Sequence, residues 1–486
     1  MNVARAQALA VEQWRKIGPQ FLPFADAATK DLPLSRLLRL SLFQVTVGMA
    51  MGLLVGTLNR VMIVELKVSA ALVAAMIALP LLFAPFRALV GFRSDTHRSA
   101  FGWRRVPFLW LGTMVQFSGF AIMPFALLLL SGDHQSPMWY GHAGAALAFL
   151  LVGIGMQVTQ TAGLALATDL ATDETRPRVV SLMYVMLLVG TLLGSLAFGY
   201  LLQGFTPLRL IQVVQGAGLL TFILNAIALW KQEARQPERA ALQRATKAPR
   251  ASFKASWAAF AGHGKTRRFL WAVFLGSAAF SMQDIILEPY GAEVLGLSVS
   301  ATTLLTAFTA AGALASFMMS AKLLSRGFDP FRLCAIGVMI GVVAFSAIIF
   351  SDPLKSTTLF RIGAMLVGLG GGFFAIGTLT AAMSLDGTAE AGLTLGAWGA
   401  LQATGSGLAI AAGGILRDGV AYMAAQGWLG EVMSAPATSY SVVYHIEIGL
   451  LFLTLVVLGP LVRRVAGMQS DLPRSTRPFG LVEFPK

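Results

Sequence analysis

Twelve apolar runs, each about twenty residues long, fill most of the sequence and constrain its fold more than any other feature. Each run is long enough to cross the roughly 30 Å hydrocarbon layer of a bilayer as a helix. Only 12% of the residues are charged and 56% are hydrophobic, which excludes a soluble globular domain. The runs are too long for the strands of a membrane barrel. The sequence therefore predicts an all-α integral membrane protein.

The predicted transmembrane helices divide into two groups of six. They cover residues 37–64, 70–89, 107–130, 138–167, 179–202, 208–230, 269–294, 301–324, 331–350, 357–385, 393–416 and 441–462.

Basic residues are distributed unevenly between the two sides that these spans define. If both termini share one side, 31 of the 37 Lys and Arg fall in the tails and even-numbered loops. Positive residues favour the cytoplasm, so both termini are expected there. Residues 231–268 hold ten Lys or Arg and form a linker between the halves. We expect them to fix topology, although they are also able to attract anionic headgroups.

The predicted organisation has five parts and is typical of the two six-helix repeats of a major-facilitator-type transporter. A cytoplasmic tail with a modestly amphipathic stretch comes first, and a second cytoplasmic tail ends the chain. The parts are residues 1–36, 37–230, 231–268, 269–462 and 463–486.

No pattern in the sequence predicts covalent chemistry. Gly264, Lys265 and Thr266 fit a permissive phosphate-loop pattern, but a loop between membrane spans lacks the strand and domain that hold a nucleotide. His and Cys residues show no metal-ligand spacing, and the single cysteine, Cys334, lies in an apolar run. We expect neither an enzyme nor a resident metal, and no nucleic-acid partner.

The second loop resembles the loop signature of the major facilitator superfamily, in which a Gly, an Asp and a later Gly with basic residues latch neighbouring helices. The second Gly lies seven residues after the Asp, so an insertion separates the two parts. We interpret the loop as a structural latch, and its residues are Gly91, Asp95, Arg98, Gly102, Arg104 and Arg105.

Three longer stretches are more specific. They are residues 56–66 (GTLNRVMIVEL), 93–105 (RSDTHRSAFGWRR) and 280–291 (FSMQDIILEPYG). Together they resemble the PucC-like bacteriochlorophyll delivery family, a branch of the major facilitator superfamily found in phototrophs. The family includes proteins for peripheral light-harvesting complexes and a branch, often called LhaA, for the core complex. The resemblance slightly favours the branch for the core complex.

This resemblance implies a factor that assists the assembly of light-harvesting complexes and handles bacteriochlorophyll. The partners that it implies are light-harvesting polypeptides, with bacteriochlorophyll synthase and the membrane insertion machinery as further candidates. The implied location is the inner, intracytoplasmic membrane of a bacterium. Two alternatives stay open, because fold does not decide function: a proton-coupled transporter of a small solute, and a pigment-free scaffold for client helices.

Ionisable residues inside two of the spans are candidates for function, since charges in lipid are costly. Arg60 and Glu65 lie in the outer part of the first span, and Asp284, Glu288 and Glu293 follow along the seventh. The first spans of the two halves line the central cavity in the resembled superfamily, so we expect Arg60 to pair with Glu288. The pair either locks the two halves together or forms part of a proton-coupled site.

Bacteriochlorophyll carries a magnesium that accepts an axial ligand from an imidazole or an amide oxygen, so such groups in the spans are candidate ligands. They are His142, His445, Gln283 and Asn59. Each also has a simpler interpretation, because interfacial histidines and buried amides commonly form hydrogen bonds.

Glycines suggest where helices approach closely. Gly48, Gly52 and Gly56 recur every four residues, which favours helix packing within this protein or a groove for a client helix. Four glycines crowd residues 368–372 and predict a bend or hinge in the tenth span.

Overall fold

The computed structural model describes residues 32–82, 105–131, 137–172, 175–232, 264–384, 391–430 and 433–468, and in these ranges the chain is helical, without strands. The first group of helices is α2 (Leu34–Met51) with its π-helical continuations η3 (Gly52–Leu58) and η4 (Val61–Glu65), α3 (Ala70–Leu82), α5 (Val106–Leu130), α6 (Met138–Leu170), α7 (Arg176–Leu201) and α8 (Pro207–Leu229). The second group is α11 (Gly264–Ser281), the 3₁₀ turn η6 (Met282–Ile285), α12 (Leu287–Glu293), α13 (Val299–Ser325), α14 (Pro330–Ser351), α15 (Thr357–Ser384), α16 (Ala391–Ala425) and α17 (Pro436–Met468).

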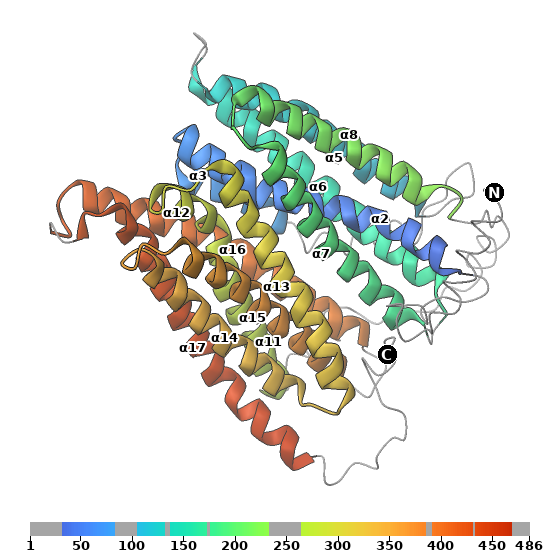
Figure 1. Ribbon diagram of the computed structural model, residues 1–486. Coiled ribbons are helices and arrows are strands. Elements are labelled where there is room, and N and C mark those ends of the chain that lie inside the picture. The colour runs from blue at the N-terminus through green and yellow to red at the C-terminus, as the bar shows by residue number, and fades with distance from the viewer. Residues whose placement is uncertain are drawn as a thin grey trace, which may run out of the picture.

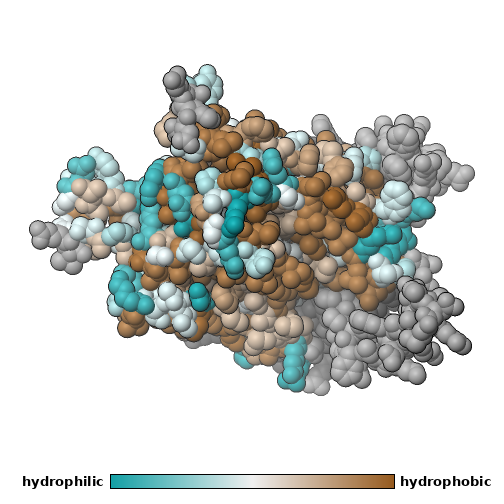
Figure 2. Space-filling model, turned by 45° about the horizontal axis from the view of Figure 1, so that its top comes forward, coloured by the Kyte–Doolittle hydropathy of each residue, from teal (hydrophilic) through white to brown (hydrophobic). Residues whose placement is uncertain are grey.

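The predicted membrane fold is confirmed. Within the described ranges, eleven helices are long and apolar enough to cross a membrane, and α3 adds a shorter apolar helix at Ala70–Leu81. The predicted second span continues to residue 89, but residues 83–104 lie outside the described part of the chain. Figure 2 shows broad hydrophobic areas on the exterior. Large apolar side chains are exposed on the described helices, among them Phe125 at 66% and Val456 at 70%. Such a surface suits lipid, because soluble monomers rarely expose large apolar patches.

The long helices lie side by side, and α2 begins at the end of the bundle where α17 ends (Figure 1). Helix α16 packs on α3, and α13 packs on α7, so both contacts join the first group to the second. The predicted domain boundaries stay a prediction, since most of the linker at residues 231–268 lies outside the described ranges.

Glycines allow close contact between this protein's own helices. A Cβ on Gly48 would lie 2.0 Å from the carbonyl oxygen of Leu187 in α7, and one on Gly52 would lie 2.8 Å from the Ser195 hydroxyl. The glycines of α15 act in the same way, since a Cβ on Gly368 would lie 1.8 Å from the Thr309 carbonyl oxygen. Helix α15 is continuous through its glycine cluster, and a bend or hinge there stays a prediction. Within the described ranges, π-helical and 3₁₀ turns lie in spans one and seven.

Candidate functional site

The first spans of the two groups both depart from α-helical geometry where they meet. Span one is π-helical over most of residues 52–65, and span seven contains the 3₁₀ turn η6. Asn59, fully buried between η3 and η4, donates from Nδ2 to the carbonyl oxygens of Asp284 and Ile285 at 3.1 and 3.0 Å. Irregular turns of this kind are frequent at functional sites and hinges. A single amide therefore holds the two irregular segments together.

Glu288 lies beside the Asn59 contact but forms no direct ion pair with Arg60. Its Oε1 accepts a 2.6 Å hydrogen bond from the hydroxyl of Thr306 in α13, while its Oε2 has no partner among the described residues. Gly56 lies against the carboxylate, because a Cβ there would come within 2.5 Å of Oε1. Arg60 instead forms a 2.6 Å ion pair with Glu65 and donates to the Leu297 carbonyl at 3.4 Å. Arg60 and Glu288 therefore do not form the predicted direct ion pair, although the Arg60 charge still acts electrostatically on Glu288.

The reason lies in the winding of span one. Residues five apart are separated by about 140° around a regular α-helix, which would keep Arg60 and Glu65 on different faces. The π-helical segment η4 (Val61–Glu65) bonds at i to i+5 and brings the two side chains together. A partner on the same helix thus replaces the expected partner in span seven.

Asp284 and Glu447 form the second acidic feature of the interior. Gln283 donates from Nε2 to Asp284 Oδ1, so this amide supports a carboxylate. Glu447, on α17, is fully buried, and neither carboxylate oxygen makes a hydrogen bond of ordinary geometry to a described residue, although the backbone N–H of Gln283 lies close to it. Asp284 is near enough to act on it electrostatically. Sequence reasoning missed Glu447, although a carboxylate in the middle of a predicted span was a sufficient signal.

Glu293 belongs to a separate cluster at the outer end of the bundle. Its Oε2 accepts from Arg417 Nη2 at 2.6 Å and from the Tyr440 hydroxyl at 2.7 Å. Arg417 also bonds Asp418 at 3.0 Å, and Asp418 Oδ2 accepts from the Ala71 backbone N–H at 2.8 Å. The cluster connects α12, α16 and α17, and reaches α3 in the first group. Its residues tie the two groups together, as the predicted Arg60 pair was expected to do.

The two histidines have different surroundings. His142, on α6, is half-buried. His445, on α17, is exposed, and its Nδ1 lies 2.7 Å from the Ser441 carbonyl oxygen. A carbonyl only accepts, so Nδ1 is the donor in this contact, and in a neutral imidazole the lone pair then lies on Nε2. An imidazole in this state can serve as an axial ligand to a metal-bearing ring.

Most of the predicted loop latch lies outside the described residues, including Gly91, Asp95, Arg98, Gly102 and Arg104. Arg105 is described at the start of α5, and its Nε pairs with Asp169 Oδ2 at 3.0 Å. This ion pair ties the start of α5 to the end of α6. Within the described part of the chain, no group of three His, Cys, Asp or Glu residues could hold a metal ion.

Comparison with solved structures defines the class of fold. A bacterial homologue of the human lysosomal transporter Spinster, in an inward-facing and occupied conformation, superposes with a TM-score of 0.63 at 16% identity, covering 92% of this chain and 100% of that one. The nucleoside transporter NupG gives 0.60 at 14% identity, covering 87% and 98%. The protein therefore has the fold of a major-facilitator-type transporter.

The family follows from the sequence. The family described as PUCC protein matches residues 57–466, and this chain belongs to it. Protein PucC of Rhodovulum sulfidophilum is 55% identical over 86% of this chain and 92% of its own length. An uncharacterized protein of the puhA-bchM intergenic region of Rhodobacter capsulatus is 54% identical over 96% of this chain and 97% of its own.

Proposed function

We propose that this protein is a membrane assembly factor for photosynthetic light-harvesting complexes and that it handles bacteriochlorophyll. Membership of the PUCC family supports the assembly role. A weaker relative in Rhodobacter capsulatus, 27% identical, is named as a chain of bacteriochlorophyll synthase, which connects the wider group with this pigment. Its partners would be light-harvesting polypeptides, with bacteriochlorophyll synthase and the insertion machinery as suppliers of pigment and nascent chain.

The depth of His445 in the membrane carries the pigment part of the proposal. The span Pro436–Val462 has 27 residues. At 1.5 Å per residue it is about 40 Å long, so about 5 Å extends beyond each side of a centred hydrocarbon layer. His445 lies nine residues into the span, at about 13 Å along the axis and therefore roughly 8 Å inside that layer. An exposed imidazole there lacks the water that an interfacial histidine has.

The surface around His445 suits a flat macrocycle. Gly449, one turn further along the same face, has nothing within 4 Å of the position of a Cβ, so the space beside the imidazole is open. Phe452 and Val456 follow on this face and are 53% and 70% exposed, which provides apolar contacts for a ring and its hydrocarbon tail. When bound, the pigment would supply its magnesium, and His445 Nε2 would hold it from one side.

His142, by contrast, lies only four residues into the 33-residue span Met138–Leu170. That span is about 50 Å long, so His142 lies outside a centred hydrocarbon layer and fits an interfacial role. Gln283 and Asn59 are buried inside the helix bundle, so neither can present its amide oxygen to a macrocycle on the lipid-facing surface, although those oxygens have no partner among the described residues. Among the four predicted ligands we therefore select His445.

A cell assay tests this proposal. In a phototrophic bacterium lacking this chain, the wild type and His142→Leu should restore the near-infrared bands of light-harvesting complexes, whereas His445→Leu should restore them poorly. Full restoration by His445→Leu, at equal protein level, would reject His445 as the pigment ligand. Failure of the wild type to affect any light-harvesting complex would reject the assembly function itself.

Solute transport is the second candidate, and the carboxyl groups of buried Glu288 and Glu447 and of half-buried Asp284 favour it. Carboxyl groups inside membrane spans commonly mark ion or proton pathways. Purified protein in sealed vesicles should then take up protons when a substrate gradient is imposed, and Glu288→Gln should abolish the uptake. Pigment-dependent assembly that persists in Glu288→Gln would separate the two functions.

The proposed location is the bacterial inner membrane, with both termini and the linker at residues 231–268 in the cytoplasm. Protease added to intact spheroplasts should leave this linker uncut, and cleavage of the linker would show that the orientation is the opposite one.

A further inference from the structure

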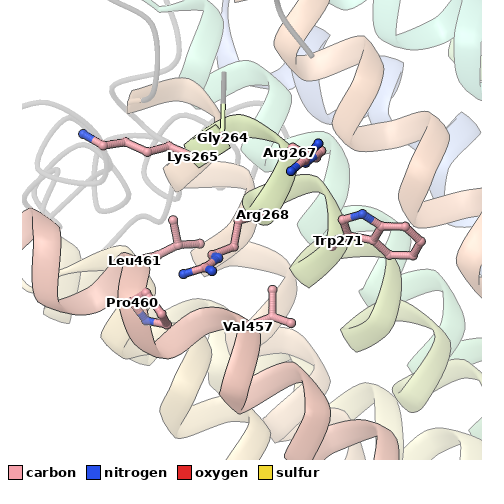
Figure 3. A pocket seen from close by; sticks show the side chains of 8 residues that line it. All are labelled: Gly264, Lys265, Arg267, Arg268, Trp271, Val457, Pro460 and Leu461. Carbon is pink, nitrogen blue, oxygen red and sulfur yellow. The ribbon is translucent and has the colours of Figure 1, made fainter. Parts of the chain in front are cut away.

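A groove with three basic side chains lies between the start of α11 and the end of α17. It has a volume of about 610 Å³, within the range of about 300 to 1,000 Å³ found for small-ligand sites. Its lining residues are Gly264, Lys265, Arg267, Arg268, Trp271, Val457, Pro460 and Leu461. Figure 3 shows the Arg268 side chain between α11 and the apolar side chains of α17.

Among the described residues, the groove is cationic without a compensating acid. No described Asp or Glu lines it, and none of the ion pairs between described residues includes Lys265, Arg267 or Arg268. All three side chains are exposed. The backbone N–H groups in the first turn of α11, an 18-residue helix, add the partial positive charge of a helix N-terminus. Charge complementarity therefore requires an anionic occupant.

The other wall of the groove is apolar and specifies the kind of anion. Val457, Pro460 and Leu461 form the side contributed by α17, and Trp271 lies one turn deeper into the span on α11. Trp side chains prefer the level of lipid headgroups. A free phosphate would gain nothing from these apolar contacts, whereas a phospholipid can place its phosphate among the cations and its glycerol and first acyl carbons against α17.

We propose that this groove binds the headgroup of one anionic phospholipid, such as phosphatidylglycerol. The start of α11 lies on the side that the charge distribution predicts to be cytoplasmic, and that leaflet carries anionic lipid. The bound lipid bridges the first and last spans of the second helix group, since it contacts α11 and α17 together. The pigment site proposed around His445 uses other residues of α17 than those that line this groove.

Native mass spectrometry of the detergent-solubilised protein, titrated with phosphatidylglycerol, tests the site. Each cation near an anionic headgroup contributes about a fivefold gain in affinity, so Arg267→Gln/Arg268→Gln should weaken the tightest binding event about 25-fold. The matched control is Arg326→Gln/Arg332→Gln, which removes two exposed cations, one directly after α13 and one in the first turn of α14. Its affinity should equal that of the wild type.

A second variant fills the groove without changing its charge. Val457→Phe should also weaken phosphatidylglycerol binding, and phosphatidylcholine should bind weakly to all variants. Wild-type affinity in Arg267→Gln/Arg268→Gln or in Val457→Phe, or an equal loss in the control, would overturn the proposal. Displacement of the lipid by inorganic phosphate at millimolar concentration would also overturn it, because the groove would then be a site for soluble phosphate.

Discussion

The amide of Asn59 is the contact whose removal most directly tests how the two irregular spans are held together. It donates to two backbone carbonyls of span seven, those of Asp284 and Ile285, at 3.1 and 3.0 Å. Asn59→Leu keeps the number and branching of the side-chain heavy atoms but removes both N–H donors. Side-chain hydrogen bonds inside membrane proteins average about 0.6 kcal/mol and reach about 1.7 kcal/mol. Loss of two should therefore lower the free energy of unfolding by about 1 to 3 kcal/mol.

Asn225→Leu is the matched control, because Asn225 is also a buried amide with two partners. Its partners are the hydroxyls of Thr46 and Thr113, both at 2.9 Å. Each hydroxyl also bonds a carbonyl of its own helix at 2.8 Å, so neither is left without a partner. The loss for Asn225→Leu should therefore be about 1 kcal/mol or less.

Reversible unfolding by dodecyl sulfate in mixed micelles measures both variants. Asn59→Leu should be the less stable of the two variants, by up to about 3 kcal/mol. A value for Asn59→Leu within about 0.5 kcal/mol of the wild type would refute the reasoning, since that is the range of substitutions that touch nothing important.

The same unfolding assay checks three further predictions. Gly48→Ala should destabilise by about 1 to 3 kcal/mol because its Cβ would clash with α7. Gly216→Ala is the control: its Cβ would enter open space, so it should be neutral or stabilise by up to about 1 kcal/mol. Equal effects of the two substitutions would contradict the described helix packing. Glu447→Gln should not destabilise, since neither carboxylate oxygen makes a hydrogen bond of ordinary geometry to a described residue. A loss of unfolding free energy above about 1 kcal/mol would show that one of these oxygens does accept a hydrogen bond. Arg417→Gln should cost about 2 kcal/mol of unfolding free energy by breaking its 2.6 Å contact with Glu293. Adding Glu293→Gln should restore part of that free energy, because it removes the unpaired carboxylate. Further loss in the double variant would contradict the pairing.

The number and positions of the spans could be predicted from the sequence because lipid imposes one rule on all of them. An apolar run of about twenty residues has few folded alternatives to a helix. The end of α16 differs most, at Ala425 and not residue 416. Helix ends such as this depend on turn contacts that hydropathy does not record.

The partners of the polar side chains could not be predicted in the same way. Arg60 pairs with Glu65 only because span one is π-helical, and the sequence contains no local signal for that winding. Glu293 was expected in one network with Asp284 and Glu288, but the turn η6 and the position of Arg417 on α16 place it in another. Such choices depend on helix rotation and depth, which emerge from packing between segments far apart in sequence.

The two histidines show the same limit. Residue type selected both as candidates, but exposure and the Ser441 contact separate His445 from His142 only after the helices are assembled.

The most direct test of the central claim is an absorption spectrum of the purified protein titrated with bacteriochlorophyll in mild detergent. The account predicts saturable binding of pigment with the spectral shift of axial ligation. His445→Leu should bind roughly tenfold or more weakly and lose that shift, while His142→Leu should match the wild type. Absence of saturable binding by the wild-type protein, or an unchanged spectrum for His445→Leu, would contradict the claim.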